Sequence, residues 1–270
     1  MMQQCIHLLK RSTILILITL ITLFTIVLPA DSASGSDPEQ LSEKYSEQLA
    51  ELARYMKQRG FDLEPHYEDS RFEIYEGISN RFTGSPERST PTLDEYKEIL
   101  NFEDKTSRIA EFIDRYQDHL SSAEETYGIS RYVISAILAV ESDFGRVTGR
   151  YNPFNVYVSM IAEDYRSTFA RAQLEELLIF ARDRQLDIFE MNSSYAGAMT
   201  AAQFIPYSLN RWFVGDDLTD MSDNIHSVAN YLAHFKKITG TIDGAVHRYN
   251  PSTLYTRTVL DMANKAESGD

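Results

Sequence analysis

The sequence predicts an all-α protein. Apolar residues recur every three or four positions in several stretches, helix-capping residues stand before these stretches, and Gly stands after several of them. No stretch alternates apolar and polar residues as a half-buried strand would, and no segment repeats. With 270 residues, of which 43% are hydrophobic, the chain is long enough to bury one substantial core.

The first 33 residues are typical of a secretory signal peptide. Lys10 and Arg11 precede an apolar run over residues 14–28, and small residues follow through Ala33. We therefore expect an exported, periplasmic protein. The alternative is an uncleaved anchor in the inner membrane, because the apolar run is long enough to span a bilayer.

Composition excludes several classes of function. The net charge of −14 argues against nucleic acid as the partner. The one cysteine, Cys5, precedes the apolar run, where lipoprotein processing would not place it, so the mature chain would hold no disulfide and no thiol nucleophile. His226 and His234 lack a ligand spacing, and the acidic run over residues 216–223 lacks the pattern of a calcium loop. We expect neither a metal nor a cofactor.

Residues 34–92 are predicted to form an N-terminal helical extension and a linker. After Asp37 and Pro38, a helix that Gly60 ends is marked by apolar residues at Leu41, Tyr45, Leu49, Leu52 and Met56. From residue 61 to 92, proline and glycine interrupt the pattern, so we predict a linker with one short helix.

Residues 93–270 are predicted to form the main helical domain. We expect a short helix over 93–100, a long one from Ile109 to Tyr127 that Gly128 ends, and a loop over 148–155. Further helices are expected over 167–184, from a cap at Asp223 to Gly240, and over the last residues from about Leu254.

A nearly all-apolar stretch, SRYVISAILAVESDFG (130–145), predicts a helix that carries one acid, Glu141. Ser130 is suited to cap this helix and Gly145 to end it. At helical spacing, the carboxylate lies on the same stripe as Ile134, Ile137 and Leu138. An unpaired acid on a buried face has a raised pKa. The alternative is a structural acid that accepts backbone N–H bonds or pairs with Arg146 or Arg150.

The segment SSYAGAMTAAQFIPYS (193–208) is rich in Ala and Gly. Small side chains allow its backbone to approach a ligand closely, and Gln203 adds an amide that donates and accepts hydrogen bonds. Tight packing between helices would explain the same composition.

Together these motifs resemble the soluble and lipid-anchored lytic murein transglycosylases of the MltB type. The likeness covers roughly Leu93 to the last helix and rests on AEETYGISRYVISAILAVESDFGR, YR with Phe169, QLEELL, SYAGAMTAAQFIPYS, SVANYL and YNPSTLYTRTVL. It implies a lysozyme-like helical domain that cleaves the bond between N-acetylmuramic acid and N-acetylglucosamine in peptidoglycan, leaving a 1,6-anhydromuramyl end. Peptidoglycan glycan strands would then be the partner.

The resemblance also implies roles for single residues. Glu141 falls on the catalytic acid and base, and the residues implied to contact the glycan are Ser194, Gln203, Tyr249, Asn250, Tyr96, Tyr231 and Tyr255. After Met, the family usually has Gly, then an aromatic residue or Pro, then a small residue before Gln; this chain has Thr200, Ala201 and Ala202 there. It also has Tyr207 where Ser is usual. The calcium loop of some relatives is not matched.

One carboxylate suffices for the implied reaction. A glycosidase that uses water needs a second carboxylate about 5–5.5 Å or roughly 6.5–9.5 Å away. Asp143 is a poor candidate, because two residues along a helix rotate a side chain by about 200°. Attack by the sugar's own 6-hydroxyl removes the need, since Glu141 can first protonate the leaving oxygen and then take the hydroxyl proton.

Two alternatives remain at this point. A hydrolytic muramidase on the same fold would need a carboxylate facing Glu141. A non-catalytic peptidoglycan-binding scaffold, tethered to the membrane through its N-terminal segment, would keep the cleft without the reaction, although an intact Glu141 argues against it.

The first testable prediction concerns processing. We expect to find the mature protein outside the cytoplasmic membrane, as a soluble species that begins near residues 30–34. The reason is that a basic flank, an apolar run and small residues succeed one another in the order typical of a signal peptide. N-terminal sequencing of the purified protein checks this. A species that still begins at Met1 and requires detergent for extraction would instead support the anchor.

Overall fold

A computed structural model describes residues 44–83 and 91–269. The predicted signal peptide or anchor, and the start of the first predicted helix, lie outside these residues. Within them the regular secondary structure is helical, apart from isolated β-bridges, which confirms the all-α class. No described helix combines the length and the apolar character that crossing a membrane requires.

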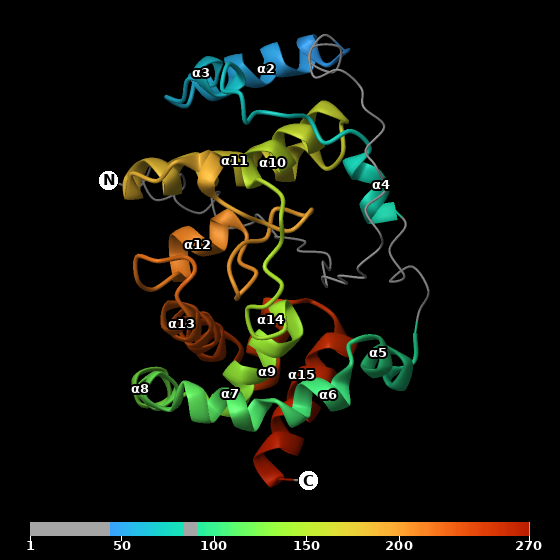
Figure 1. Ribbon diagram of the computed structural model, residues 1–270, viewed down its shortest axis with the longest axis vertical. Helices are drawn as coiled ribbons and strands as arrows, with labels where there is room; N and C mark the ends of the chain where they lie inside the picture. The colour runs from blue at the N-terminus through green and yellow to red at the C-terminus, as the bar shows by residue number, and fades with distance from the viewer. Residues whose placement is uncertain (1–43, 84–90, 270) are drawn as a thin grey trace, which may run out of the picture.

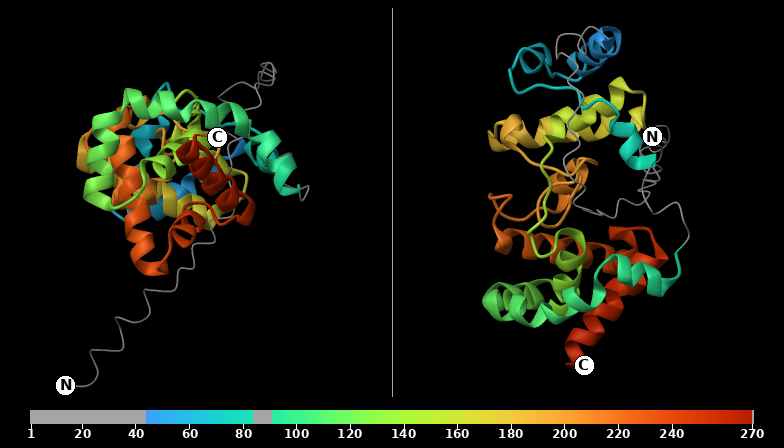
Figure 2. Two further views of the ribbon diagram at one scale, coloured as in Figure 1. Left: turned by 90° about the horizontal axis from the view of Figure 1, so that it is seen from below. Right: turned by 45° about the vertical axis from the view of Figure 1, so that its right-hand side comes forward.

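The helices are arranged along one long axis (Figure 1). At one end lie α2 (Ser46–Lys57) and α3 (Glu64–Tyr67), above α10 (Pro153–Ala162) and α11 (Ser167–Arg184). At the other end lie α5 (Leu93–Ile99), α6 (Phe102–Ser107), α7 (Ile109–Arg115), α8 (Gln117–Tyr127), α9 (Arg131–Ser142) and α15 (Thr253–Ser268). The remaining elements are α4 (Ile78–Thr83), η2 (Ile188–Glu190), α12 (Pro206–Trp212), α13 (Met221–Thr239) and α14 (Ile242–Tyr249). The right-hand view of Figure 2 shows the same two ends from another direction.

Helix α9 is the central helix of the second end. The Ser130 hydroxyl accepts a hydrogen bond from the Tyr132 N–H, as the sequence predicted for a cap, and every residue from Val133 to Ser142 is buried. The helix ends at Ser142 rather than at Gly145. Asp143 and Phe144 both adopt left-handed backbone angles, with φ of 53° and 59°, so the chain turns sharply directly after Glu141.

The loop predicted over 148–155 is wrong from Pro153 on, where helix α10 begins, and no element was predicted for the rest of this helix. The Asn152 side chain caps the helix by accepting from the Asn155 N–H at 3.1 Å, and Pro153 occupies the first position. All ten residues of α10 are buried. Because a fully buried helix needs no polar face, it lacks the periodicity from which helices are read in a sequence.

Other boundaries also differ from the prediction. The long helix expected from Ile109 to Tyr127 is divided at Tyr116 into α7 and α8. Helix α13 begins one turn early, because Asp220 and not Asp223 accepts hydrogen bonds from the first N–H groups. Helices α6, α12 and α14 were not predicted; each has fewer than nine residues, too few for a clear period.

The N-terminal extension packs on the rest of the chain. Leu49, Leu52 and Met56 of α2 are buried, and α2 contacts α10. Arg59 bonds Glu175 of α11 at 3.0 Å. The buried apolar residues from Tyr45 to Ala263 form one continuous cluster.

The Ala-Gly segment folds as a loop held by backbone contacts, not as a helix. Ser193 and Tyr151 exchange two backbone hydrogen bonds, and so do Met199 and Phe204. The loop lies so close to its neighbours that a Cβ on Gly197 would stand 2.3 Å from the Tyr157 ring. The alternative explanation for this composition, tight packing between two helices, was therefore wrong, because the segment is a loop. Small residues are nevertheless needed for its close approach to neighbouring side chains.

Thr200 carries strain within this loop. Its φ is +68°, a region that costs a residue with a Cβ about 1–2 kcal/mol. We expect Thr200→Gly to be more stable than Thr200→Ala by on the order of 1 kcal/mol. Both variants lose the hydroxyl and the γ-methyl group, and only Gly also removes the Cβ that makes the positive φ costly. Urea unfolding of the two variants measures the difference.

Helix α15 supplies the matched control. At Ala266, which has ordinary helical geometry, Gly should be less stable than Ala by roughly 1 kcal/mol. If Gly is the less stable residue at position 200 as well, Thr200 is not strained.

Candidate active site

Glu141 lies in the last turn of α9 and is 7% exposed. The Tyr255 hydroxyl on α15 donates a hydrogen bond to its Oε1 at 2.6 Å. Within the described residues Glu141 forms no ion pair and no backbone N–H donates to its carboxylate, so neither contact of the structural alternative is present. Burial raises the pKa of Glu141 to about 7, against the opposing effects of the Tyr255 hydrogen bond and the Lys105 ammonium.

Asp143 is engaged elsewhere. Its carboxylate accepts from Arg108 at 2.6 Å and from Arg146 Nε at 2.9 Å. These guanidinium groups hold its pKa below the usual value despite partial burial. The carboxylate therefore braces α7 against the end of α9, which agrees with the prediction that it does not serve as a second catalytic acid.

A cleft opens beside Glu141. The described residues that line it are Glu141, Arg166, Phe169, Ala198, Gln203, Phe204, Ile205, Ser208, Tyr231, Tyr249 and Asn250. Glu141 is the one carboxylate among them. The cleft thus combines a single acid with aromatic rings and two amides.

The two amides leave acceptors in the cleft. Gln203 is 8% exposed and donates to the carbonyl oxygens of Thr200 and Thr148, at 2.8 and 3.3 Å. Its Oε1 and the Oδ1 of Asn250, which is 5% exposed, find no hydrogen-bond partner within the described part of the chain. Because unpaired buried acceptors are costly, both are suited to accept from a ligand N–H or O–H.

Three of the predicted tyrosines surround the acid. Tyr255 contacts Glu141 directly, Tyr249 donates to the Ala202 carbonyl at 2.5 Å, and Tyr231 donates to the Arg248 carbonyl at 2.6 Å. The rings of Tyr231 and Tyr249 meet edge to face with centroids 4.8 Å apart. Burial raises the pKa of each phenol, so all three are neutral donors. Tyr249 also fixes the Ala-Gly loop to α14.

Besides Tyr255, which bonds Glu141, two predicted residues lie outside the cleft lining. Ser194 is 1% exposed, and its Oγ accepts from the N–H groups of Ala196 and Ala198 at 3.3 and 3.2 Å. Tyr96 is buried on α5, close enough to Tyr255 to influence its pKa. For both, contact with a ligand stays a prediction.

Two cationic residues near the acid were not predicted from the sequence. Arg166 lines the cleft, and its guanidinium lies 4.4 Å from the centroid of the Phe169 ring. The Tyr165-Arg166 pair was part of the resemblance, but it was given no role. Lys105 of α6 is partly buried and acts on Glu141 through its charge; nothing in its local sequence distinguishes it from other lysines.

The acidic run over residues 216–223 has a structural role. The Asp223 carboxylate accepts from the N–H groups of Asp216 and Asp217, each at 3.0 Å, and Asp220 caps α13. In the described ranges, no group of three or more acidic, His or Cys side chains is placed to hold a metal ion.

Known proteins are similar to this chain in sequence and in fold. Over 129 residues, the chain is 36% identical to membrane-bound lytic murein transglycosylase B of Escherichia coli; this segment is 45% of the chain and 36% of that relative's length. The fold matches soluble lytic transglycosylase SltB1 of Pseudomonas aeruginosa with a TM-score of 0.69 and 23% identity, over 85% of this chain and 99% of that one.

SltB3 of P. aeruginosa matches with a TM-score of 0.68 and 18% identity, over 86% of this chain and 80% of that one. The family model described as the Transglycosylase SLT domain matches residues 44–241, most of the chain. This protein therefore belongs to the SLT transglycosylase family.

Proposed function

We propose that this protein is a peptidoglycan lytic transglycosylase, which cleaves the bond between N-acetylmuramic acid and N-acetylglucosamine and forms a 1,6-anhydromuramyl end. The observation that carries the proposal is a single buried carboxyl with a pKa of about 7, in a cleft with no second carboxylate among its described lining residues. Membership of the family supports it. SltB3 of P. aeruginosa has been crystallised in complex with NAG-anhNAM-pentapeptide.

The first step requires Glu141 as an acid. With a pKa of about 7, the carboxyl is protonated in a large fraction of molecules at neutral pH and can protonate the leaving glycosidic oxygen. Tyr255 holds Oε1, which leaves Oε2 to carry the proton toward the sugar. The catalytic acid of lysozyme depends on the same effect, because there too an apolar pocket raises the pKa of a Glu.

The second step uses the same residue as a base. After bond cleavage, the Glu141 carboxylate can take the proton from the muramyl 6-hydroxyl, whose oxygen then attacks C1 and closes the anhydro ring. No water needs to be activated, so the chemistry is complete with one carboxylate. The acetamido carbonyl of the muramyl residue can stabilise the positive charge that develops at C1 between the steps.

Recognition of the sugars falls to the amides and rings of the cleft. The free acceptors Gln203 Oε1 and Asn250 Oδ1 can accept from an acetamido N–H or a hydroxyl. Tyr231, Tyr249 and Phe204 form an aromatic wall against which the apolar faces of sugar rings can pack. Ser194 is proposed, from the family resemblance, to act on the acetamido group.

A hydrolytic muramidase and a non-catalytic scaffold are less well supported. Hydrolysis needs a second carboxylate within about 10 Å, and the described cleft residues provide none. A non-catalytic scaffold would not need a buried acid whose pKa is raised to about 7. Mass analysis of digested sacculi separates the three functions, because anhydro ends, reducing ends and no products are mutually distinct results.

The site of action is proposed to be the periplasm. The E. coli relative is named as membrane-bound. A signal segment at the N-terminus of this chain would deliver it to the compartment that holds peptidoglycan.

Glu141→Gln is expected to abolish release of anhydromuropeptides while it preserves folding and glycan binding. Gln keeps the volume and can still accept from Tyr255, but it cannot deliver a proton. The loss should reach or exceed roughly 10⁴-fold, because one group serves both steps. Product release from sacculi, measured by mass spectrometry, gives the rate.

Asp143→Asn is the matched control for that variant. It removes a carboxylate two residues away that bonds Arg108 and Arg146, so stability should fall while turnover per folded molecule persists. Turnover retained by folded Glu141→Gln, or abolished by Asp143→Asn, would contradict the assignment of one catalytic carboxylate.

Stability should also report the raised pKa of Glu141. Below pH 4.5 the carboxyl is protonated in both the folded and the unfolded chain. As the pH rises from 4.5 through 7, the unfolded chain gains stability relative to the folded one, by about 3 kcal/mol for a shift from 4.5 to about 7. The free energy of unfolding of Glu141→Gln minus that of the wild type should therefore grow by roughly this amount between about pH 4 and about pH 8.

Urea denaturation of both proteins across this pH range measures the difference. A difference that shrinks with rising pH would instead show a carboxylate stabilised by partners in the folded state.

A further inference from the structure

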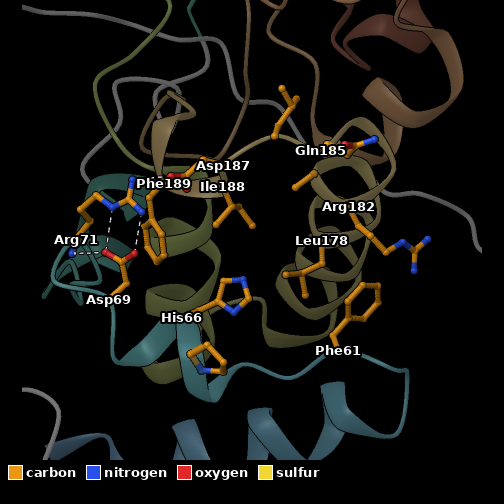
Figure 3. Close-up of a pocket in the computed structure, with 13 residues that line it drawn as sticks. Phe61, His66, Asp69, Arg71, Leu178, Arg182, Gln185, Asp187, Ile188 and Phe189 are labelled. Carbon is orange, nitrogen blue, oxygen red and sulfur yellow. Dashed lines mark hydrogen bonds and ion pairs between the residues drawn. The ribbon is translucent and has the colours of Figure 1, made fainter.

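A second cavity lies apart from the cleft, where α3 meets the C-terminal end of α11 and η2. Its volume is about 440 Å³, within the range of small-molecule sites, and it shares no lining residue with the cleft. Figure 3 shows Arg71 and Asp69 on one side, Phe61 and Leu178 on the other, and His66 between them.

One wall of this cavity is polar and fixed. Arg71 bonds Asp69 through Nε and Nη2 at 2.9 and 2.7 Å and bonds Asp187 through Nη1 at 2.8 Å. Hydrogen bonds from the guanidinium lower the pKa of Asp69 to about 2 and lower that of Asp187, so both acids are ionised near neutral pH. Carboxylate oxygens each have more than one lone pair, so this wall retains acceptors for a ligand.

The opposite wall is apolar. Phe61 and Leu178 face the polar wall, whereas Phe189 lies beside Arg71, whose guanidinium is 5.0 Å from the centroid of its ring (Figure 3). Ile188 also lines the cavity, and His66 stacks on Phe154 with ring centroids 5.2 Å apart. Burial lowers the pKa of His66, so this imidazole is neutral near pH 7. The cavity therefore presents aromatic and aliphatic surface facing a hydrogen-bonding wall.

Carboxylates outnumber the cation at the polar wall. The Arg71 guanidinium pairs with Asp69, Asp187 and Glu190, and Arg182 pairs with Asp183. The surplus negative charge disfavours a phosphate, and a wholly apolar ligand would cover the polar wall without satisfying it. A neutral ligand with hydroxyl and amide groups on an apolar ring fits both walls.

We propose that this cavity is an accessory saccharide site that binds an N-acetylhexosamine unit of the glycan strand. The choice of a saccharide as the ligand rests on the proposed function, whereas the description of the cavity is independent of that function. A polymeric substrate held here as well as in the cleft gains effective concentration, whereas a short oligosaccharide bound in the cleft alone does not. Loss of the site should therefore raise KM on polymeric glycan and leave kcat nearly unchanged.

The test is an NMR titration of the Glu141→Gln protein, which retains the fold without turnover, with tetra-N-acetylchitotetraose. We expect the backbone amides of Phe61, Leu178 and Gln185 to shift with a saturation curve separate from that of Asn250 in the cleft. Leu178→Trp should fill the cavity and abolish the first set of shifts, whereas Leu178→Met, which conserves volume, should keep them.

Phe61→Leu provides a second variant on a partly exposed side chain, should the Trp variant not fold. It keeps apolar surface but loses the aromatic face, and we expect roughly three- to tenfold weaker binding at this cavity with cleft binding unchanged. No shift at the three amides, or equal affinity in Phe61→Leu and the parent, would overturn the proposal. A response to free stem peptide but not to the saccharide would overturn it too.

Failure of the proposed function is a separate result. If sacculi yield no anhydro products with the wild type, the lytic activity is wrong, whereas the titration uses an inactive variant and reports binding at the cavity alone.

Discussion

The desolvation of one carboxyl group is the constraint on which the rest of the site depends. Glu141 is carried on a helix whose last ten residues are all buried, and it meets one hydrogen-bond donor, Tyr255, where an exposed carboxylate would meet several water molecules. Burial is the largest contribution to its raised pKa. A salt bridge to Glu141 would lower the pKa of its carboxyl and remove the acid function. The nearby guanidinium groups of Arg108 and Arg146 bond Asp143 and not Glu141.

Backbone strain is concentrated around this group. Asp143, Phe144, Arg166, Thr200 and Gln203 all have positive φ, and each lies within three residues of Glu141 or in a segment that contributes to the cleft. Such conformations persist only where surrounding contacts enforce them. Here the contacts are the Tyr249 hydrogen bond to Ala202, the pair of hydrogen bonds between Met199 and Phe204, and the approach of Tyr157 to Gly197. The sharp turns place an amide and a loop beside the acid where a regular helix would not.

The sequence predicted what depends on local pattern. The cap at Ser130, the buried stripe of α9, the helices near 93–100 and 167–184, and the position of Glu141 all follow from spacing and capping residues. It did not predict α10, since a helix buried on every side has no polar face, or the end of α9, since left-handed Asp and Phe residues are rarely favoured. Tyr255 lies 114 positions from Glu141, and only the packing of α15 on α9 brings them together. The resemblance to a family, not periodicity, identified that tyrosine.

A buried carboxyl group with a pKa near neutral pH destabilises the folded chain once it ionises. At about pH 8 its ionisation opposes the native state by about 3 kcal/mol, a sizeable part of the roughly 5–15 kcal/mol by which domains are stable. The surrounding fold offsets this cost with apolar burial: α10 is buried along its whole length, and the core extends without a break from α2 to α15. The N-terminal extension covers α10 through Leu49, Leu52 and Met56. The extension therefore supports the proposed catalytic site without being among the described residues that line the cleft, because it helps to stabilise a fold that keeps one acid out of water.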